Sequence, residues 1–225
     1  KIFGDLQDLI LEKRVFHLDS DSDVDGIYIH DVDWKLLTER ILSLLKDFHL
    51  KYPLRYGIPK EEVTGRIGIA SQYAPDCLQN WLASGIVKTM NGLVASAEHQ
   101  IQYSPAQQIR MREFLSQLDM DPVNTPTVKS AQDALSEELF QSLVDQEMIV
   151  RVSQDVIFST QQYQVMLDHV LQVCQRGKII TVAEFRDHFH TSRKYSLAFL
   201  EYLDKKGITE RYGEGRRLAG GISTY

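Results

Sequence analysis

Residues 181–218 read TVAEFRDHFH, TSRKYSLAFLEYLDKKG and ITERYGEGRRL, and this stretch decides the fold. Thr181 and Glu184 have the spacing of a capping box, in which each side chain bonds the backbone of the other residue. The spacing predicts a helix that begins at Thr181 and ends near His190.

A second helix and a hairpin are predicted directly after the first helix. Thr191 or Ser192 can cap the second helix, and Gly207 stands where a glycine commonly ends one. The segments 208–212 and 216–218 flank Gly-Glu-Gly, which predicts a β-hairpin. Two short helices followed by a hairpin form a winged helix-turn-helix.

The second predicted helix has one apolar and one polar face. The apolar face comprises Tyr195, Ala198, Phe199, Tyr202 and Leu203. The polar face comprises Arg193, Lys194, Leu197, Glu201 and Lys205. We expect the first face to pack on a core and the second to meet solvent or a partner.

The charge of the chain is unevenly distributed. Residues 163–225 hold 10 Lys and Arg against 7 Asp and Glu, whereas the rest of the chain holds 15 against 24. Such asymmetry indicates that an acidic partner binds the last unit. The overall charge of −6 argues against non-specific nucleic-acid binding along the whole length.

The polar face carries groups that suit phosphate. A helix N-terminus favours an anion through its backbone N–H groups and its dipole, and Arg193 and Lys194 follow the hydroxyls of Thr191 and Ser192. The residues alone also permit a solvated face on a winged helix that packs against protein. Further basic side chains that we expect on the same side are Arg186, Arg211, Arg216 and Arg217.

The composition is that of a soluble globular protein, with 43% hydrophobic and 25% charged residues among 225. No apolar run is long enough to span a bilayer, and no signal peptide opens the chain. Cys77 and Cys174 lie far apart without metal-ligand spacing, which suits a reducing compartment. We therefore predict a cytoplasmic protein without a membrane partner.

The helix–helix–hairpin pattern recurs at intervals of about 60 residues. Asn91-Gly92 is a strong hairpin signal, and Ser104 with Gln107 forms a second capping box. We predict a mainly α fold with small β-hairpins, built as tandem winged helix-turn-helix domains, three complete and part of a first. The predicted domains are 1–32 (partial), 33–103, 104–159 and 160–225.

No pattern indicates catalysis or a metal. Residues 21–26 (DSDVDG) copy half of an EF-hand loop, but Val32 stands where the bidentate Glu belongs, so we interpret them as an acidic hairpin tip. His188 and His190 have no further ligands nearby in sequence. Phosphate-loop, dinucleotide and nucleophile-elbow patterns are absent. We predict no catalytic residue, metal ligand or cofactor in this chain.

Two groups of motifs resemble one family. FHL at 48–50 and PLRYGIPKEE at 53–62, with VAEFRD at 182–187, TSRKY at 191–195 and LEYLD at 200–204, resemble the C-terminal region of SelB, the bacterial selenocysteine-specific translation elongation factor. The resemblance covers essentially the whole chain and implies four winged helices, the first cut short. From the residues alone, 53–62 is interpreted as a rigid connector between two helices.

The resemblance implies a function in selenocysteine incorporation. The last winged helix would bind the selenocysteine insertion hairpin (SECIS) of a selenoprotein mRNA beside an in-frame UGA codon. The other units would link it to the GTP-binding body that carries selenocysteyl-tRNA to the ribosome. That body is absent from this sequence, so we expect no enzyme here. GTP and magnesium would bind the missing domain of the parent protein, and we expect this chain to be a monomer.

The family's RNA contacts fall in the last helix-turn-helix, and carried over they are Arg186, Thr191, Ser192, Arg193, Lys194 and Tyr195. The helical spacing turns Tyr195 toward the core. A-form RNA has a major groove too narrow for a helix, so the helix should lie on the backbone while unpaired bases give specificity. His188 or His190 is expected to stack on such a base, and Arg211, Arg216 and Arg217 are predicted contacts of the wing.

Two other functions remain open on the sequence. A DNA-binding winged-helix regulator needs a dimer and a second basic unit, but 33–103 holds 8 basic against 7 acidic residues and 104–159 holds 4 against 9. A protein-interaction scaffold of stacked winged helices needs only an acidic protein partner. The scaffold should shift neither hairpin RNA nor duplex DNA in a gel.

Overall fold

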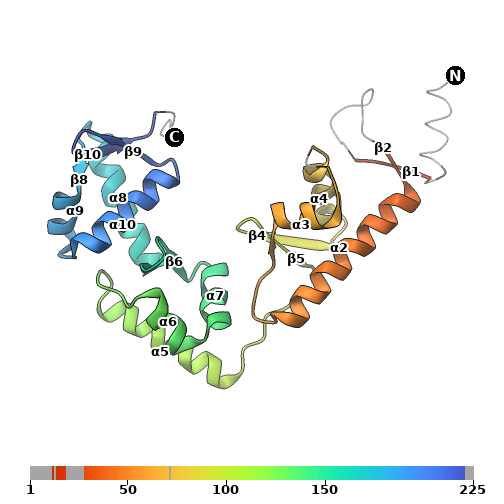
Figure 1. Cartoon of the computed structure of the whole chain (residues 1–225), viewed down its shortest axis with the longest axis horizontal. Helices are drawn as coiled ribbons and strands as arrows, with labels where there is room; N and C mark the ends of the chain where they lie inside the picture. Colours follow the sequence, from red (N-terminus) through yellow and green to blue (C-terminus); the bar gives the residue numbers. More distant parts are fainter. Residues whose placement is uncertain (1–11, 13, 19–27, 71, 221–225) are drawn as a thin grey trace. The chain divides into compact units, whose positions relative to one another are not determined.

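A computed structural model describes residues 12, 14–18, 28–70 and 72–220 of the chain. The fold has two compact units, Lys1–Gln102 and Tyr103–Tyr225 (Figure 1). The acidic segment 21–26, and most of the partial winged helix predicted over 1–32, lie outside the described residues. No helix among the described residues has both the length and the apolar content needed to cross a bilayer.

The first unit contains a complete winged helix behind a short antiparallel strand pair. The second strand of that pair leads directly into the longest helix, and the later strands form a sheet of order β3-β5-β4. The elements are β1 (Val15–His17), β2 (Tyr28–His30), α2 (Asp31–Lys51), β3 (Ile58–Pro59), α3 (Lys60–Ile67), α4 (Ala74–Ala83), β4 (Val87–Met90) and β5 (Leu93–Ser96).

Local sequence explains the wing of this unit. Asn91 and Gly92 have φ of 54° and 76°, the left-handed backbone that a two-residue hairpin turn requires. The hairpin predicted there is confirmed by the pairing of β4 with β5.

Two tryptophans form the centre of the first core. The rings of Trp34 and Trp81 stack with centroids 5.1 Å apart. The Trp81 indole N–H donates to the Thr38 hydroxyl at 2.8 Å, so its polar group is satisfied inside the core. Ile41 and Leu45 are fully buried beside them. The aromatic pair therefore joins α2 to α4.

The connector after α2 is held from several sides, in agreement with its interpretation as a rigid link. The Arg55 guanidinium lies 5.9 Å from the centre of the Phe48 ring. The Arg55 carbonyl lies 3.0 Å from Nε2 of His99, whose ring stacks on His49 at 3.6 Å. At Gly57, a Cβ would lie only 2.1 Å from the Val94 carbonyl oxygen.

Gly57→Ala should destabilise the first unit by at least about 2 kcal/mol, because the methyl group would force β5 away from the connector. Gly65→Ala is the matched control: Gly65 lies in α3 with open space at its Cβ, so alanine should stabilise by about 0.5–1 kcal/mol. Urea unfolding monitored by tryptophan fluorescence measures both, since Trp34 and Trp81 lie in this unit. Equal stabilities of the two variants would contradict the close contact.

Acid should weaken the first unit through His49. Burial and, next, the neighbouring His99 lower the pKa of His49 to about 4 from an ordinary 6.5. As pH falls, the unfolded chain therefore takes up this proton at a higher pH than the folded chain does. The contribution of His49 to the free energy of unfolding is complete above pH 6.5 and is lost as pH falls toward 4. Because the ring is only half-buried, we expect a loss of about 1 kcal/mol.

The measurement is the free energy of unfolding at pH 7 and pH 5 for the unmodified chain and for His49→Gln. The variant should lose less stability between the two pH values, because one titrating ring is removed. The same pH dependence in both proteins would show that His49 does not titrate in this way.

The second unit contains two winged helices in succession. Both capping boxes predicted from the sequence, Ser104 with Gln107 and Thr181 with Glu184, are confirmed. The last sheet has the order β8-β10-β9. The elements are α5 (Pro105–Met120), α6 (Val128–Leu135), α7 (Glu137–Asp145), β6 (Ile149–Arg151), β7 (Ile157–Ser159), α8 (Thr160–Gln175), β8 (Ile180–Thr181), α9 (Val182–Phe189), α10 (Arg193–Lys205), β9 (Thr209–Tyr212) and β10 (Gly215–Leu218).

The two winged helices of the second unit share one apolar core. Phe199 of α10 is fully buried, and its ring contacts Phe185 of α9 at 5.1 Å and Tyr163 of α8 at 5.6 Å between centroids. Phe158 of β7 packs on the same ring at 6.0 Å. The hairpin β6–β7 therefore contributes to the core of the last winged helix, across the boundary predicted at residue 159.

Candidate nucleic-acid interface

The predicted reading surface begins at the tight turn between α9 and α10. His190 ends α9 in the left-handed region, with φ of 51° and ψ of 39°. Ser192 occupies the N-cap position of α10, but its side chain makes no capping hydrogen bond. The first N–H groups of α10 thus lack the side-chain acceptor that Glu184 and Thr181 supply at α9. An uncapped helix N-terminus suits an anion.

Three of the predicted contact residues, Arg186, Ser192 and Arg193, are exposed but differ in their partners. Ser192 and Arg193 are exposed at the start of α10, and within the described residues no side chain pairs with the Arg193 guanidinium. Arg186 is also exposed, and its guanidinium bonds the carboxylate of its neighbour Asp187 at 2.7 Å. Ser192 and Arg193 are therefore the predicted residues most available to a ligand.

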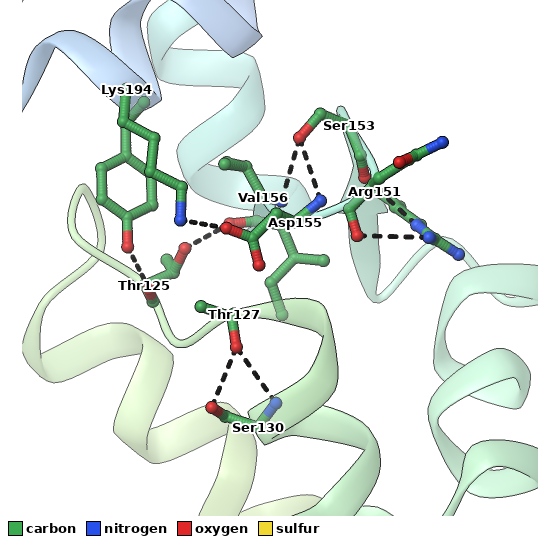
Figure 2. A network of polar contacts seen from close by, with 11 residues as sticks. Thr125, Thr127, Ser130, Arg151, Ser153, Asp155, Val156 and Lys194 are labelled. Carbon is green, nitrogen blue, oxygen red and sulfur yellow. Dashed lines mark hydrogen bonds and ion pairs between the residues drawn. The ribbon is translucent and has the colours of Figure 1, made fainter.

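The other predicted residues of this turn contact the preceding winged helix instead. Thr191 is 9% exposed, and its hydroxyl donates to the Val123 carbonyl at 2.7 Å. The Tyr195 hydroxyl donates to the Thr125 carbonyl. The Lys194 ammonium donates to a carboxylate oxygen of Asp155 (Figure 2). The Thr191 hydroxyl, which the sequence placed on the phosphate-binding face, is thus buried against the preceding winged helix.

The β6–β7 turn presents Asp155 to Lys194. The Ser153 hydroxyl accepts hydrogen bonds from the N–H groups of Asp155 and Val156, at 3.2 and 3.0 Å. The Arg151 guanidinium donates to the carbonyls of Ser153 and Gln154, so the turn is fixed from both sides (Figure 2). The hydrogen bond to Asp155 raises the pKa of Lys194, which keeps the ammonium charged. No sequence signal connected these two residues, because 39 positions separate them.

The two histidines predicted to stack on a base, His188 and His190, differ in their surroundings. His188 stacks on His169 of α8 with centroids 3.6 Å apart, and its edge meets Phe189. Burial and, next, the neighbouring His188 lower the pKa of His169, so the neutral form of His169 is favoured in the stack. His190 is exposed at the turn. His188 is therefore already covered on one ring face.

Two arginines of the wing, Arg216 and Arg217, lie on opposite faces of strand β10. Successive strand residues point to opposite faces, and Arg216 and Arg217 are adjacent in β10. Arg217 is half-exposed and bonds Glu210 at 2.8 Å. Arg216 is 3% exposed and bonds Asp204 of α10 at 3.1 Å. The prediction that Arg216 lies on an exposed face is therefore wrong.

The remaining wing residue predicted from the sequence, Arg211, is exposed and lies 3.8 Å from a carboxylate oxygen of Glu201. Sequence reasoning missed Tyr212, which is 52% exposed at the end of β9. The signal that was available is an aromatic residue placed between arginines beside a hairpin turn. The described residues contain no group of three or more His, Cys, Asp or Glu placed to hold a metal ion.

These features define a protein of tandem winged helices with an exposed basic helix N-terminus in the last one. Two family models, both described as "Elongation factor SelB, winged helix", match residues 42–95 and 172–218. Both matched segments are SelB-type winged-helix domains, and the resemblance to the C-terminal region of SelB is confirmed. Neither model describes a GTPase domain.

Two curated proteins similar to this chain are named selenocysteine-specific elongation factors. The selenocysteine-specific elongation factors of Desulfomicrobium baculatum and Haemophilus influenzae are 20% and 21% identical to 79% and 80% of this chain. The chain spans about 30% of the length of these relatives.

Two solved structures are similar at 19–20% identity. The match to a bacterial selenocysteine-specific elongation factor (EF-Sec) covers 88% of this chain and 31% of that protein, with a TM-score of 0.43. The match to the mRNA-binding domain of SelB from E. coli, solved with SECIS RNA, covers 52% of this chain and 99% of that domain, with a TM-score of 0.41.

Thr191→Val should loosen the start of α10 by about 1–2 kcal/mol, because it leaves the Val123 carbonyl without its donor. Ser192→Ala is the control, since the Ser192 side chain makes no capping bond and should change stability by less than about 0.5 kcal/mol. Hydrogen exchange of the α10 amides measures both changes. Equal protection in the two variants would show that the Thr191 bond does not hold the turn.

Proposed function

We propose that this chain is the mRNA-binding region of a selenocysteine-specific elongation factor. The last winged helix recognises the selenocysteine insertion hairpin of a selenoprotein mRNA. It thereby recruits the factor, with selenocysteyl-tRNA, to in-frame UGA codons on ribosomes in the cytoplasm. GTP and magnesium belong to another part of the longer protein, and this chain is a monomer.

The observation that carries this proposal is the exposed N-terminus of α10. Its first N–H groups have no side-chain cap, and the Arg193 guanidinium beside them has no partner among the described residues. Backbone N–H groups, a helix dipole and a guanidinium together bind a phosphate well. The SelB family match over 172–218 supports a selenoprotein mRNA hairpin as the ligand.

The geometry suggests how such an RNA is held. A phosphate at the start of α10 is bonded by the free N–H groups, the Ser192 hydroxyl and Arg193. Lys194 adds its charge from the same turn once an RNA phosphate replaces Asp155, an exchange that costs little because exposed ion pairs contribute about 0–1 kcal/mol. Few phosphates are neutralised, so specificity depends on unpaired bases of the hairpin.

A DNA-binding regulator fits these contacts less well. Thr191 and Tyr195 hold the start of α10 against the residues 123–125, which occupy one flank of the helix. A helix that enters a major groove needs its N-terminal residues free on the sides that meet the groove walls. The same contacts are compatible with a helix that lies on an RNA backbone.

Arg193→Ala should weaken binding of a selenoprotein mRNA hairpin by about 1–3 kcal/mol, because a charge-assisted phosphate contact is lost. Lys194→Ala should cost less, since the free protein already uses that ammonium for Asp155. Lys205→Ala, at the opposite end of α10, is the control and should change affinity less than about twofold.

The measurement is a titration of the full chain with the hairpin, with a scrambled-loop hairpin and duplex DNA beside it. Binding that prefers the intact loop supports the proposal. Indifferent binding to all three nucleic acids, or an Arg193→Ala affinity equal to that of Lys205→Ala, would remove the α10 N-terminus from the function and favour the protein scaffold.

A further inference from the structure

The outer face of the last wing displays an aromatic ring beside a guanidinium. Tyr212 is 52% exposed, and the Arg217 guanidinium carbon lies 4.5 Å from the centre of its ring. Both residues belong to the β9–β10 hairpin, where Arg217 pairs with Glu210 and Tyr212 pairs with Gly215. The two side chains are thus diagonal neighbours on one face.

Glycine at position 215 permits this arrangement. Gly215 has no side chain opposite Tyr212, so the tyrosine ring leans across the ladder toward Arg217. A Cβ at residue 215 would also lie 2.9 Å from the Ile180 carbonyl oxygen and 3.3 Å from the Ile179 Cβ. Ile179, 39% exposed, therefore lies on the same outer face. Tyr212 and Ile179 are two of the exposed large apolar side chains of this winged helix.

The inner face of the hairpin fixes the outer face in place. Arg216 is buried under the sheet and bonds Asp204 at the end of α10, and Asp204 also accepts a hydrogen bond from the Thr209 hydroxyl at 2.7 Å. The backbone of the wing is thereby tied to α10. On the outer face, Glu210 bonds Arg217 at 2.8 Å and orients its guanidinium over the ring. The Tyr212 platform is therefore ordered before any ligand binds.

We propose that the Tyr212–Arg217 platform on the outer face of the wing binds an unpaired nucleobase of the RNA by stacking. This inference rests on the proposed function and deepens it, because it names where an unpaired base is held. It assigns Tyr212, a residue absent from the predicted contacts, and it differs from stacking on His188, whose ring already lies against His169.

The chemistry of the platform fits a base better than a phosphate. Exposed charges on the hairpin are balanced, with Arg211 and Arg217 against Glu210 and Glu214, so no excess positive charge attracts a backbone. A tyrosine ring flanked by a guanidinium offers a flat π surface, on which bases of single-stranded RNA stack. The platform belongs to the same winged helix as Arg193.

The experiment measures affinity of the full chain for the hairpin RNA at several salt concentrations. Tyr212→Ala should weaken binding by about 5- to 100-fold, the effect of one lost base–aromatic stack. The slope of log affinity against log salt should stay unchanged, because no phosphate contact is removed, whereas Arg193→Ala should reduce that slope by about one. Tyr212→Trp should restore the affinity to within about twofold.

Further variants separate stacking from other effects. Arg217→Lys keeps the charge but loses the planar group, so it should give a partial loss. Val165→Ala removes another exposed apolar side chain, 51% exposed on α8, and should leave affinity unchanged. The melting temperature of Tyr212→Ala should match that of the unmodified chain, because the ring is half-exposed.

The outcomes distinguish this inference from the proposed function. Loop-selective hairpin binding that Tyr212→Ala leaves unchanged would overturn the platform and retain the function. A loss that Tyr212→Trp does not restore, or that occurs equally with a fully paired duplex RNA, would also overturn it. If the unmodified chain binds no hairpin selectively, the proposed function fails first, and the platform is overturned as an RNA site.

Discussion

The packing of Phe199 is the interaction on which the second unit depends. Its ring contacts α8, α9 and the hairpin β6–β7, so the core of the last winged helix is completed by residues of the preceding one. Burial of an aromatic ring of this size contributes strongly to stability and tolerates little displacement. The position of α10 against residues 123–125 and 155 follows from this packing, and with it the choice of which basic side chains stay accessible.

This shared core reduces the proposed RNA-binding surface. The surface is smaller than a helix-turn-helix in isolation would offer, because Thr191, Lys194 and Tyr195 contact the preceding winged helix. What remains is the uncapped helix end with Arg193, and the outer face of the wing with Tyr212. In the proposed function the first binds a phosphate and the second an unpaired base, so backbone binding and base recognition would be divided between the two proposed sites.

The first unit is constructed differently around its own core. Two stacked tryptophans join α2 to α4, and the connector at Gly57 packs so closely on β5 that a methyl group has no room. The family motif in this region is explained by packing: Arg55 on Phe48, and His49 on His99. In this unit the motif residues thus hold elements together, whereas in the last winged helix they also form the surface proposed to bind RNA.

The sequence by itself determined the local elements: the capping boxes, the Asn-Gly hairpin, the helix faces and the tandem winged-helix order all depend on neighbours a few residues apart. It also determined the net positive charge of residues 163–225 and the resemblance to SelB. Only the tertiary structure decided that Arg216 is buried, that Lys194 meets Asp155 and that Tyr212 stands beside Arg217. Strand alternation could have separated Arg216 from Arg217, but which face is covered depends on α10. Contacts between residues 39 or 70 positions apart leave no local pattern, because packing of whole elements brings them together.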